Sequence, residues 1–588
     1  MAFTLKTQTA EPLAPPVPLK PTANRSILFG TGLTQKTTAK AVTDIKHVES
    51  SESRLDEESA KYHAEEVAAG DADEWMDDHQ LPTTLVDESM QPDEHQQMAI
   101  DGLLNQQFGC MIGAAGTGKT TAMKWLIHAI IETVPDADIS FCSFTGRAVQ
   151  QMKRALPKTY HKQCDTIHGL LEYAPEEMES EDADGNPCMK RIFVPHRDAM
   201  NPVDANIIIV DEAGMCVIEL WNNLMKALRD GTRVYLLGDI NQLPPPMGRS
   251  VLGFAMQAWP TYELKRIHRT DESGITDGAW DILNGKLPKS VPDKVALMRV
   301  EDGSTKAFMQ TLAVTQKLSE AGKFNCLRDG IIVPQNVGPL GQEAINERLV
   351  AYFNPTREVE GMPMNPRTII TAGYNHIAFA VGDKVMVTQN DRQQGLTNGM
   401  IGVIEAITPN AGFRGDVVGD SASAHLADDY ELDMSMLDNA LDEMAAENES
   451  VDEREIQCSH TIRMRFQNVE MPIDFASAGA VNSLKHAYAF TCHKSQGGEY
   501  PVVVILVHSA NVKMLSREWL YTAWTRAQKK VILLYNSRGI QQALNRQVIK
   551  GTSIAEKAES FIKLQARSND GDMSIKMPML PERVELGE

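Results

Sequence analysis

The sequence predicts an α/β protein built on parallel β-sheets, and three segments carry this prediction. Residues 113–121 read GAAGTGKTT and match the phosphate-binding pattern G-x-x-x-x-G-K-[ST]. Residues 207–213 read IIIVDEA, and such a β-branched run suits a strand that is buried on both faces of a parallel sheet. Residues 236–245 read LLGDINQLPP, an apolar run followed by a turn-rich segment. Open α/β sheets bind ligands at the carboxyl ends of their strands, so the three segments predict one shared site.

The phosphate-binding pattern sits between a predicted strand and a predicted helix. Residues 108–112 form a short apolar run, and residues 120–131 have the apolar spacing of a helix whose N-terminus would face the phosphates. Glycines allow the loop to curl so that its N–H groups point at phosphate oxygens. An incidental glycine-rich turn is the alternative. The predicted nucleotide contacts are Gly113, Ala114, Ala115, Gly116, Thr117, Gly118, Lys119, Thr120 and Thr121.

Individual side chains in the three segments have predictable roles. Lys119 is expected to reach the β- and γ-phosphates of ATP, and the Thr120 hydroxyl to ligate Mg²⁺. Asp211 would hold the same Mg²⁺, and Glu212 would orient and deprotonate the attacking water. A helix N-cap with a first-turn acid is the alternative for this acidic pair. Gln242 is expected to report whether the γ-phosphate is present, and the prolines after it would stiffen the segment that transmits this signal.

Composition limits the class of protein. The sequence has no run of 18 or more apolar residues, and its first residues lack the apolar core of a secretory signal, so no membrane partner is expected. The eight cysteines form no CxxC pairs, which argues against a zinc ribbon or an iron–sulfur cluster. Isolated cysteines in an ATP-dependent protein fit a reducing cytoplasm.

The charge is unevenly distributed along the chain. Residues 49–94 contain sixteen acids and two bases, and residues 416–455 contain fourteen acids and one base. These segments carry net charges of −14 and −13, so the remainder of a chain with a net charge of −22 carries +5. The remainder is basic enough for a nucleic-acid partner. The acidic segments are expected to be solvated loops, and the alternatives are a nucleic-acid mimic or a docking site for a basic partner.

The same cues divide the chain. Residues 1–88 are expected to be a disordered tail rich in proline and acids, and residues 541–588 a C-terminal tail. Residues 89–261 form the predicted first domain, and its insert at 173–203 is a candidate hairpin because Asp184-Gly185-Asn186 lies between polar runs. The second predicted domain comprises residues 262–375 and 481–540. Residues 376–480, with the acidic loop, form a predicted insert in it.

Further polar residues follow or precede the predicted strands. Gln96 is placed to recognise adenine with its side-chain amide, and a helix-surface glutamine is the alternative. Thr145 and Gly146 follow a predicted strand at residues 139–142, and Thr166 and His168 lie in the later segment TIHGL. Small hydroxyl residues and backbone groups at strand ends suit phosphodiester contacts. These four residues are therefore candidate DNA contacts.

Taken together, the motifs resemble those of superfamily 1 DNA helicases of the RecD-like type, the family of the exonuclease V alpha subunit. Gln96, GAAGTGKT, SFTGRAVQ, TIHGLL, VDEAGM and GDINQLPP match the family's motifs in order. LKRIHR at residues 264–269, HAYAFTCHKSQGGE at 486–499 and LYTAWTRA at 520–527 are similar to its later motifs, and VGDKVM at 381–386 to the entry of an SH3-like insert. The resemblance covers residues 92–535. It implies two RecA-like P-loop domains in tandem, with a hairpin-like insert in the first and an SH3-like insert in the second.

The resemblance also assigns residues in the second domain. Arg269 and Arg526 are the candidates for stabilising transition-state charge from the far side of the cleft. Gly498 and Glu499 resemble residues that contact the nucleotide sugar and couple the two domains. Thr491 and His493 are implied to lie near single-stranded DNA, and a core histidine is the alternative for His493.

The function implied is an ATP- and Mg²⁺-dependent DNA helicase or translocase acting in replication, recombination or repair. The resemblance implies 5′-to-3′ movement of a monomer on single-stranded DNA and at duplex junctions. One alternative is a DNA-stimulated ATPase that acts as a switch or loader, with the N-terminal tail recruiting a replication or recombination protein. Another is a helicase subunit of a larger nuclease complex, because the chain shows no nuclease motif of its own.

Overall fold

The computed structural model describes residues 82–87, 89–181, 187–245, 250–268, 273–359, 362–373, 375–391, 394–410, 457–466, 469, 471–551 and 553–566. These residues belong to one compact unit, Asp71–Glu588. Arg269, the hairpin turn at 184–186, the acidic segment at 416–455 and most of the predicted tails lie outside the described residues.

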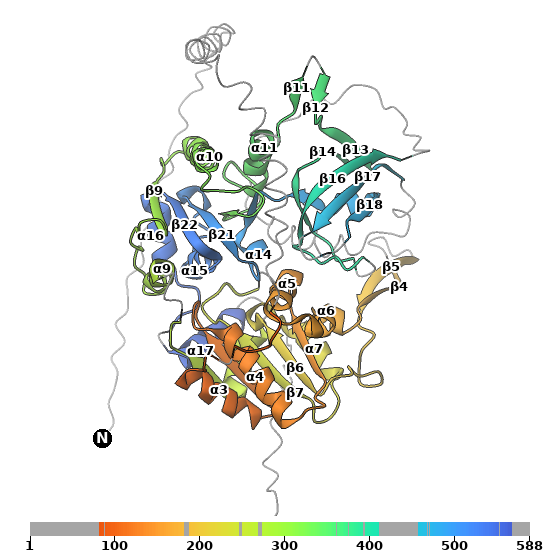
Figure 1. Cartoon of the computed structure of the whole chain (residues 1–588), viewed down its shortest axis with the longest axis vertical. Coiled ribbons are helices and arrows are strands. Elements are labelled where there is room, and N and C mark those ends of the chain that lie inside the picture. The colour runs from red at the N-terminus through yellow and green to blue at the C-terminus, as the bar shows by residue number, and fades with distance from the viewer. Residues whose placement is uncertain are drawn as a thin grey trace, which may run out of the picture. The chain divides into compact units, whose positions relative to one another are not determined.

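The first lobe, in which Figure 1 labels β6 and β7, contains a six-stranded sheet in the order β3-β2-β6-β7-β1-β8, with every neighbouring pair parallel. Its strands are β1 (Phe108–Gly113), β2 (Ile139–Ser143), β3 (Cys164–Thr166), β6 (Ile207–Asp211), β7 (Arg233–Gly238) and β8 (Thr261–Leu264). Its helices are α3 (Glu94–Leu104), α4 (Lys119–Thr133), α5 (Gly146–Ala155), η1 (Lys158–Gln163), α6 (Ile167–Leu170), η2 (Ala213–Met215), α7 (Ile218–Lys226) and α8 (Val251–Ala258).

The apolar run of β6 shows why this sheet is covered on both faces. Ile208 and Val210 pack into a core with α7 and α8, whereas Ile207 and Ile209 pack into a second core with α3 and α4. Alternate residues of a strand point to opposite faces, so a continuous apolar strand must have a layer of helices on each side. The parallel sheet expected from this run is confirmed. The sheet extends to β8, slightly beyond the boundary at residue 261 that the sequence predicts.

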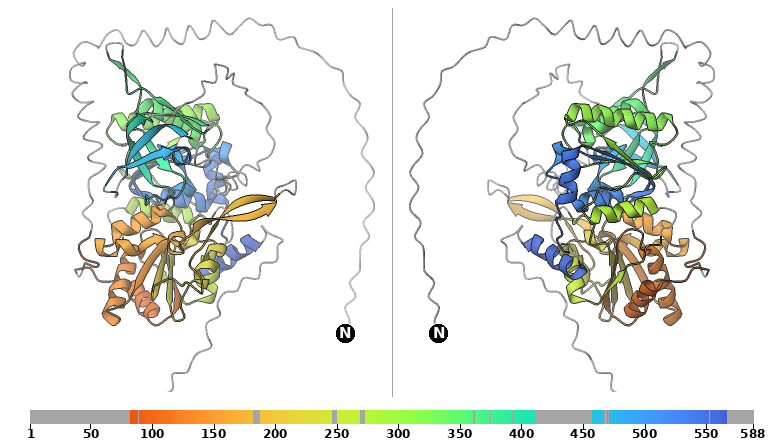
Figure 2. Two further views of the ribbon diagram at one scale, coloured as in Figure 1. Left: turned by 90° about the vertical axis from the view of Figure 1, so that its right-hand side faces the viewer. Right: turned by 90° about the vertical axis from the view of Figure 1, so that its left-hand side faces the viewer.

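The insert of the first lobe is an antiparallel hairpin. β4 (Ala174–Glu181) pairs with β5 (Pro187–Val194) along its whole length, and Figure 2 shows the two strands projecting together. Its base is fixed by Arg197, which forms an ion pair with Glu172 at 2.7 Å, and by Asn223, which donates to the Tyr173 hydroxyl. The hairpin expected from the sequence is therefore present.

The second lobe contains a five-stranded parallel sheet in the order β20-β10-β21-β22-β9. Helices cover both faces of this sheet, as in the first lobe. Its strands are β9 (Val295–Arg299), β10 (Gly330–Val333), β20 (Ala489–Thr491), β21 (Tyr500–Val507) and β22 (Ala527–Tyr535). Its helices are α9 (Ser273–Leu283), α10 (Ser304–Glu320), α11 (Gln342–Phe353), α14 (Cys492–Ser495), η5 (Ser509–Asn511), α15 (Arg517–Trp524) and α16 (Ser537–Asn545).

An antiparallel β unit is inserted between α11 and β20, where the sequence predicts an SH3-like insert. It starts earlier and ends later than the predicted range 376–480. A separate two-stranded ribbon, β11 (Arg357–Val359) with β12 (Met362–Met364), precedes it. The elements of the unit are β13 (Thr368–Ala372), β14 (Asn375–Phe379), β15 (Lys384–Val387), β16 (Ile401–Pro409), β17 (Gln457–Phe466), β18 (Ile473–Ser477), α13 (Ala478–Asn482) and β19 (Leu484–His486).

A buried carboxylate fixes the base of this unit. Asp383 accepts hydrogen bonds from Arg367 at 2.8 Å, from His486 at 2.9 Å and from Asn354 at 2.8 Å. Burial alone would raise the pKa of Asp383, but the hydrogen bonds from His486 and Arg367 outweigh it and lower the pKa. The charge of Asp383 is thus retained inside the protein and ties the insert to the second lobe.

The chain then returns to the first lobe. Helix α17 (Ile554–Ala566) packs against α8, and Ile549 is buried in the first lobe's core. The sequence places residues 541–588 in a tail, so the ordered part of this range, which includes the end of α16 and all of α17, differs from the expectation. Ala558 is buried, and the residues before α17 also have partners in both lobes, which is why this stretch folds against the body.

Two properties of the described residues bear on the class of protein. The seven cysteines whose side chains the structure describes form no disulfide with one another. None of the described helices is long and apolar enough to cross a lipid bilayer.

Candidate active site

The phosphate-binding pattern forms the connection between β1 and α4, as the sequence predicts. Gly116 and Gly118 have φ of +82° and +75°, and Gly118 is the residue that caps α4. A Cβ at Gly118 would also lie 2.6 Å from the side-chain nitrogen of Gln96, so only glycine fits there. The Lys119 ammonium donates to the carbonyl oxygens of Gly113 at 2.7 Å and Ala114 at 3.4 Å. The lysine therefore lies folded back over the loop whose N–H groups it is predicted to assist.

Gln96 contributes to the shape of this loop. It forms a capping box with Asp93 at the start of α3, in which its Oε1 accepts from the Asp93 backbone at 3.1 Å. Its Nε2 lies 3.4 Å from the carbonyl oxygens of both Thr117 and Gly118. The buried amide is thus held against the phosphate loop. Its predicted contact with adenine stays a prediction.

The acidic pair lies at the carboxyl end of β6, between β2 and β7. Burial and the neighbouring Glu212 raise the pKa of Asp211 to about 6. Glu212 has a φ of +51°, a left-handed conformation that non-glycine residues adopt rarely and at some energetic cost. Its backbone N–H donates to Asp211 Oδ1 at 2.8 Å. Glu212 precedes the short helix η2, but its side chain makes no capping hydrogen bond, which disfavours a helix-capping role for it.

Residues 238–245, here called the sensor loop, follow β7, the neighbour of both β1 and β6. Gln242 is buried, and within the described part of the chain its Oε1 has no hydrogen-bond partner. An unsatisfied buried amide oxygen costs about 1–3 kcal/mol. Such a group is retained more readily where a ligand or a moving segment can satisfy it, which agrees with the predicted γ-phosphate sensor.

The sensor loop also contacts the second lobe. The Thr522 hydroxyl accepts from the Leu243 backbone N–H at 2.8 Å, and Gln496 donates to the Leu243 carbonyl at 3.1 Å. The Oε1 atom of Gln496 is itself buried without a partner among the described residues. One residue of the sensor loop is thus held on both its backbone groups by side chains from the other lobe.

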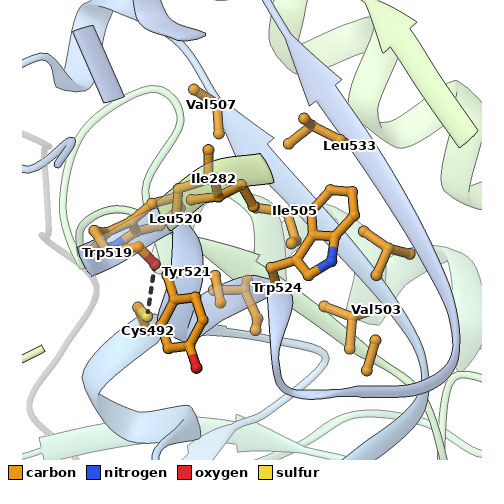
Figure 3. Close-up of a cluster of buried hydrophobic side chains, with 14 of the residues drawn as sticks. Ile282, Cys492, Val503, Ile505, Val507, Trp519, Leu520, Tyr521, Trp524 and Leu533 are labelled. Atoms are coloured by element: carbon orange, nitrogen blue, oxygen red, sulfur yellow. Dashed lines mark hydrogen bonds between the residues drawn. The ribbon is translucent and has the colours of Figure 1, made fainter. Parts of the chain in front are cut away.

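Tyr521 is a site residue that the sequence reasoning missed. Its hydroxyl donates to Asp239 Oδ2 at 2.6 Å and accepts from the Ala115 N–H at 2.8 Å, so one atom joins the sensor loop, the phosphate loop and α15. Figure 3 shows its ring at the margin of the second lobe's apolar core, with the hydroxyl directed away from Trp524 and Leu533. Burial raises the pKa of Tyr521 well above its ordinary value, which keeps the hydroxyl protonated. One signal in the sequence could have indicated Tyr521. It is a tyrosine, with a polar hydroxyl, in the apolar helical segment that precedes the predicted catalytic residue Arg526.

That arginine, Arg526, follows α15 and is buried. Its guanidinium donates to the carbonyl oxygens of Thr522 at 3.1 Å and Gly498 at 3.3 Å. Arg269 lies outside the described residues, but the segment before it crosses the phosphate loop, because the His268 N–H donates to the Gly116 carbonyl at 2.9 Å. The structure therefore brings the second lobe to the phosphate loop from two directions.

Gly498 and Glu499 lie between α5 and the residues that surround Arg526. A Cβ at Gly498 would be 2.5 Å from Arg147 Cδ, so the glycine allows the α5 side chain to approach closely. Glu499 accepts from Gln528 at 3.1 Å and lines a cavity of about 100 Å³ together with Arg147 and Arg154 of α5. Gly498 thus contacts both Arg147 of α5 and Arg526, and the role of Gly498 and Glu499 toward the nucleotide stays a prediction.

The six candidate DNA contacts lie at or near the beginnings of short helices. Thr145 caps α5 and Thr166 caps α6, each accepting a backbone N–H with its hydroxyl, and Thr491 precedes α14. Gly146 is packed beneath Thr397 of the insert. These helix starts follow β2, β3 and β20, at the carboxyl ends of strands in both lobes.

The two histidines of this group differ in their surroundings. His168 packs against the rings of Phe144 and Tyr173, with centroids 6.0 and 5.1 Å away. His493 is half-buried, and loss of solvation lowers its pKa to about 4. A neutral His493 would contact DNA through hydrogen bonding or stacking and not through charge.

Helix α5 forms a second contact between the lobes through Arg147. The guanidinium donates to the Gly399 carbonyl of the insert at 2.8 and 3.2 Å and to the Lys494 carbonyl at 2.9 Å. It also donates to the Tyr500 hydroxyl and lies over the rings of Phe490 and Tyr500. The segment SFTGRAVQ thus belongs to the first lobe, and the guanidinium of its arginine contacts the second lobe and the insert.

Comparisons with known proteins agree with this arrangement. Residues 96–248 match the AAA domain family, and residues 486–534 match the UvrD-like helicase C-terminal domain family. The first match covers the phosphate loop, the acidic pair and all of the sensor loop. The second covers α14, α15 and Arg526.

Two curated relatives align over most of the chain. The ATP-dependent RecD2 DNA helicase of Deinococcus radiodurans is 26% identical over 464 residues, which are 77% of this chain and 50% of that protein. The RecBCD enzyme subunit RecD of Mycobacterium tuberculosis is 22% identical over 504 residues, 79% of this chain and 73% of that protein. The chain therefore spans half the length of the first relative.

Solved structures that match the chain include Pif1 helicases. Pif1 in a study of DNA unwinding at forked duplexes has a TM-score of 0.42 and 17% identity, covering 76% of this chain and 92% of that one. Bacteroides Pif1 in complex with ADP-AlF3 and single-stranded DNA has a TM-score of 0.40 and 16% identity, covering 78% of this chain and 95% of that one.

Proposed function

We propose that this chain, a RecD-like protein of helicase superfamily 1, is an ATP-dependent DNA helicase that moves along single-stranded DNA. One observation carries the proposal. The phosphate loop, the acidic pair and the sensor loop follow the adjacent strands β1, β6 and β7, and α15 of the other lobe contacts two of the three through Tyr521. A nucleotide bound there would change the contacts between two lobes, which is what a motor requires.

The residues would divide the hydrolysis between them. Lys119 and the N–H groups of the phosphate loop would hold the ATP phosphates, and Glu212 would orient and deprotonate the attacking water. Asp211 and Thr120 would hold Mg²⁺, which supplies positive charge against the phosphates. The fit is sound because the raised pKa of Asp211 marks a buried carboxylate that a cation would stabilise in its charged form.

The γ-phosphate would be read from both lobes. Gln242 offers a buried amide whose oxygen lacks a partner within the described residues, and Arg526 lies two residues beyond α15, the helix that contacts the sensor loop. Arg526 and Arg269 would stabilise charge in the transition state as arginine fingers do. Gly498 and Glu499 would couple that event to α5, where their contacts lie.

DNA would pass along the helix starts that contain Thr145, Gly146, Thr166, His168, Thr491 and His493. Binding through phosphates and base stacking would be tolerant of sequence and sensitive to salt. The β4–β5 hairpin would meet the duplex junction, and the family resemblance implies 5′-to-3′ movement. We further propose a monomer in a reducing cytoplasm, with the acidic N-terminal tail as the segment that recruits a replication or recombination protein.

The decisive experiment compares unwinding of duplexes that carry either a 5′ or a 3′ single-stranded tail, with ATPase activity measured with and without single-stranded DNA. We expect DNA-stimulated hydrolysis and unwinding from the 5′ tail, both lost in Lys119→Ala. Unwinding from the 3′ tail alone would reverse the polarity. Stimulated hydrolysis with no unwinding would favour a switch or loader, and unwinding that requires a co-purified nuclease would favour a subunit of a larger complex.

A further inference from the structure

The segment before α17 connects the two lobes through specific contacts. The Glu518 carboxylate of α15 accepts from the backbone N–H groups of Val548 at 3.0 Å and Ile549 at 2.9 Å, and Arg517 donates to the Leu544 carbonyl at 2.8 Å. Ile549 is buried in the core of the first lobe. α15, which contains Tyr521, therefore also holds residues 544–549, the segment that leads to α17.

A continuous series of hydrogen bonds runs from α17 to the phosphate loop. Lys557 Nζ donates to Asn241 Oδ1 at 2.5 Å, and Asn241 Nδ2 donates to Asp239 Oδ1 at 2.9 Å. The Tyr521 hydroxyl donates to Asp239 Oδ2 at 2.6 Å and accepts from the Ala115 N–H at 2.8 Å. We call Lys557, Asn241, Asp239, Tyr521 and Ala115 the relay. Its two ends belong to a helix outside every recognised motif and to the loop predicted to hold ATP.

The environment of Lys557 is unusual for a lysine on a terminal helix. The side chain is half-buried, and burial lowers its pKa, while Asp239, Glu518 and Glu263 partly offset this by their negative charges. Lys563 on the same helix is exposed and, among the residues that the structure describes, forms an ion pair with Glu559, one turn away. A half-buried ammonium is costly unless it is well bonded, so the contact with Asn241 places Lys557 firmly.

We infer that α17 is part of the ATPase machinery, in which Lys557 is a positioning residue that sets the sensor loop and the phosphate loop through the relay. The inference rests on the proposed function and extends it to a helix of the chain's C-terminal region. Asn241 holds Asp239 Oδ1 twice, through its backbone N–H and through its side-chain Nδ2, both at 2.9 Å, and the bond from Lys557 to Asn241 Oδ1 fixes the orientation of that side-chain amide. Hydrogen bonds in a chain polarise one another, so a loss at one end weakens the bond at the other.

The test uses the full chain and the variant Lys557→Met, which keeps the apolar stem and removes the ammonium. We expect faster amide hydrogen exchange in residues 236–245 and a KM for ATP raised by about fivefold, corresponding to about 1 kcal/mol. Lys557→Arg should restore most of both. Lys563→Met is the matched control on the same helix and should leave both at wild-type values.

A double variant separates positioning from simple packing. If the relay acts as one unit, adding Lys557→Met to Tyr521→Phe should raise the KM for ATP no further than Tyr521→Phe alone, since coupled groups are not additive. Should Lys557→Met fail to fold, Asn241→Ala breaks the same relay and gives the same two measurements.

The experiments distinguish failure of the inference about α17 from failure of the proposed function. Unchanged exchange in residues 236–245 together with an unchanged KM for ATP in Lys557→Met would overturn the inference. Additive effects in the double variant would also overturn it, because they would mean that α17 only packs. A wild-type protein without DNA-stimulated ATPase activity would overturn the proposed function instead, and the exchange measurement would still decide whether Lys557 holds the sensor loop.

Discussion

The two lobes touch at two edges that use opposite chemistry. At the phosphate-loop edge the bridging side chains of α15 and Gln496 are themselves neutral, namely the hydroxyls of Tyr521 and Thr522 and the amide of Gln496, and one bond, from Tyr521 to Asp239, has a carboxylate as its acceptor. At the α5 edge the bridge is the guanidinium of Arg147, bonded to carbonyl oxygens and stacked on two aromatic rings. Both edges are buried, yet they differ in the strength of each contact.

This difference indicates which of the two contacts between the lobes should separate first when the lobes move. A neutral hydrogen bond contributes about 1 kcal/mol net because water can replace it, whereas one to a charged group contributes about 1.5–3 kcal/mol. The α5 edge, with several bonds to one cation, is the firmer of the two. We therefore expect nucleotide-driven movement to open and close the phosphate-loop edge while the α5 edge stays in place.

The largest effect should come from removing the cation of the phosphate loop. Lys119→Ala should lower the DNA-stimulated kcat by at least about a hundredfold, as losing one group that stabilises developing charge does. The thermal unfolding midpoint should stay near that of the wild type, because the Lys119 ammonium bonds to the carbonyl oxygens of its own loop, Gly113 and Ala114. Lys124→Ala on the same helix is the control, and an equal loss of kcat in both would contradict the assignment.

Arg147→Met tests the firmer edge. It leaves the Gly399 and Lys494 carbonyls without their donor, and we expect the free energy of unfolding to fall by about 3 kcal/mol. Arg147→Lys should not restore it, since an ammonium cannot reproduce the planar set of donors. Denaturant titration measures this. Arg229→Met, which breaks an exposed ion pair with Asp204, should cost under about 1 kcal/mol and is the matched control.

The pH dependence of Mg²⁺ use should arise from the phosphate-loop edge. The pKa of Asp211 is raised to about 6 by burial and by Glu212, so the carboxylate is ionised above pH 6 and takes up a proton below it. Because Mg²⁺ needs the ionised form, its apparent affinity should fall about tenfold per pH unit below 6. In the absence of metal, the raised pKa of Asp211 affects the stability of the fold in the opposite direction. The folded state binds the proton more tightly than the unfolded state, so the free energy of unfolding should increase as pH falls from about 6 toward the ordinary pKa of 3.8.

ATPase measured against Mg²⁺ concentration at several pH values checks this expectation. In Asp211→Asn the pH-dependent fall below pH 6 should disappear. A wild-type Mg²⁺ requirement that does not change between pH 5 and 7 would show that Asp211 is not the ligand.

The smallest effect should follow from Tyr521→Phe, which removes one oxygen atom. Both the Asp239 carboxylate and the Ala115 N–H lose a partner, and we expect the KM for ATP to rise about fivefold, or about 1 kcal/mol. Tyr352→Phe, at a partly exposed site on α11, is the control. If Tyr521→Phe instead lowered the unfolding free energy as much as Arg147→Met, the two edges would be equally firm.

Local pattern explains what the sequence could predict. The strand, loop and helix around Lys119, the strand before Asp211 and the hairpin after Tyr173 all follow from side chains within a few residues of one another. Apolar periodicity and glycine positions express such local preferences directly. Most of the described site residues of the first lobe therefore lie where the sequence places them.

Long-range contact explains what it could not predict. Tyr521 lies 406 residues from Ala115, and Lys557 lies 316 residues from Asn241. Nothing in the residues next to either side chain shows which carboxylate or amide it will meet. The return of α17 to the first lobe was missed for the same reason, since a short amphipathic stretch near a chain end reads as a tail.

The sequence by itself determined the chemistry of the protein: a phosphate loop, an acidic pair and a sensor amide at the ends of parallel strands. Only the tertiary structure decided how the second lobe meets them, with neutral hydroxyls at one edge, a guanidinium at the other, and α17 joined to the sensor loop through Asn241. The physical reason is that backbone preferences act over a few residues, whereas hydrogen bonds between lobes exist only after both cores have packed.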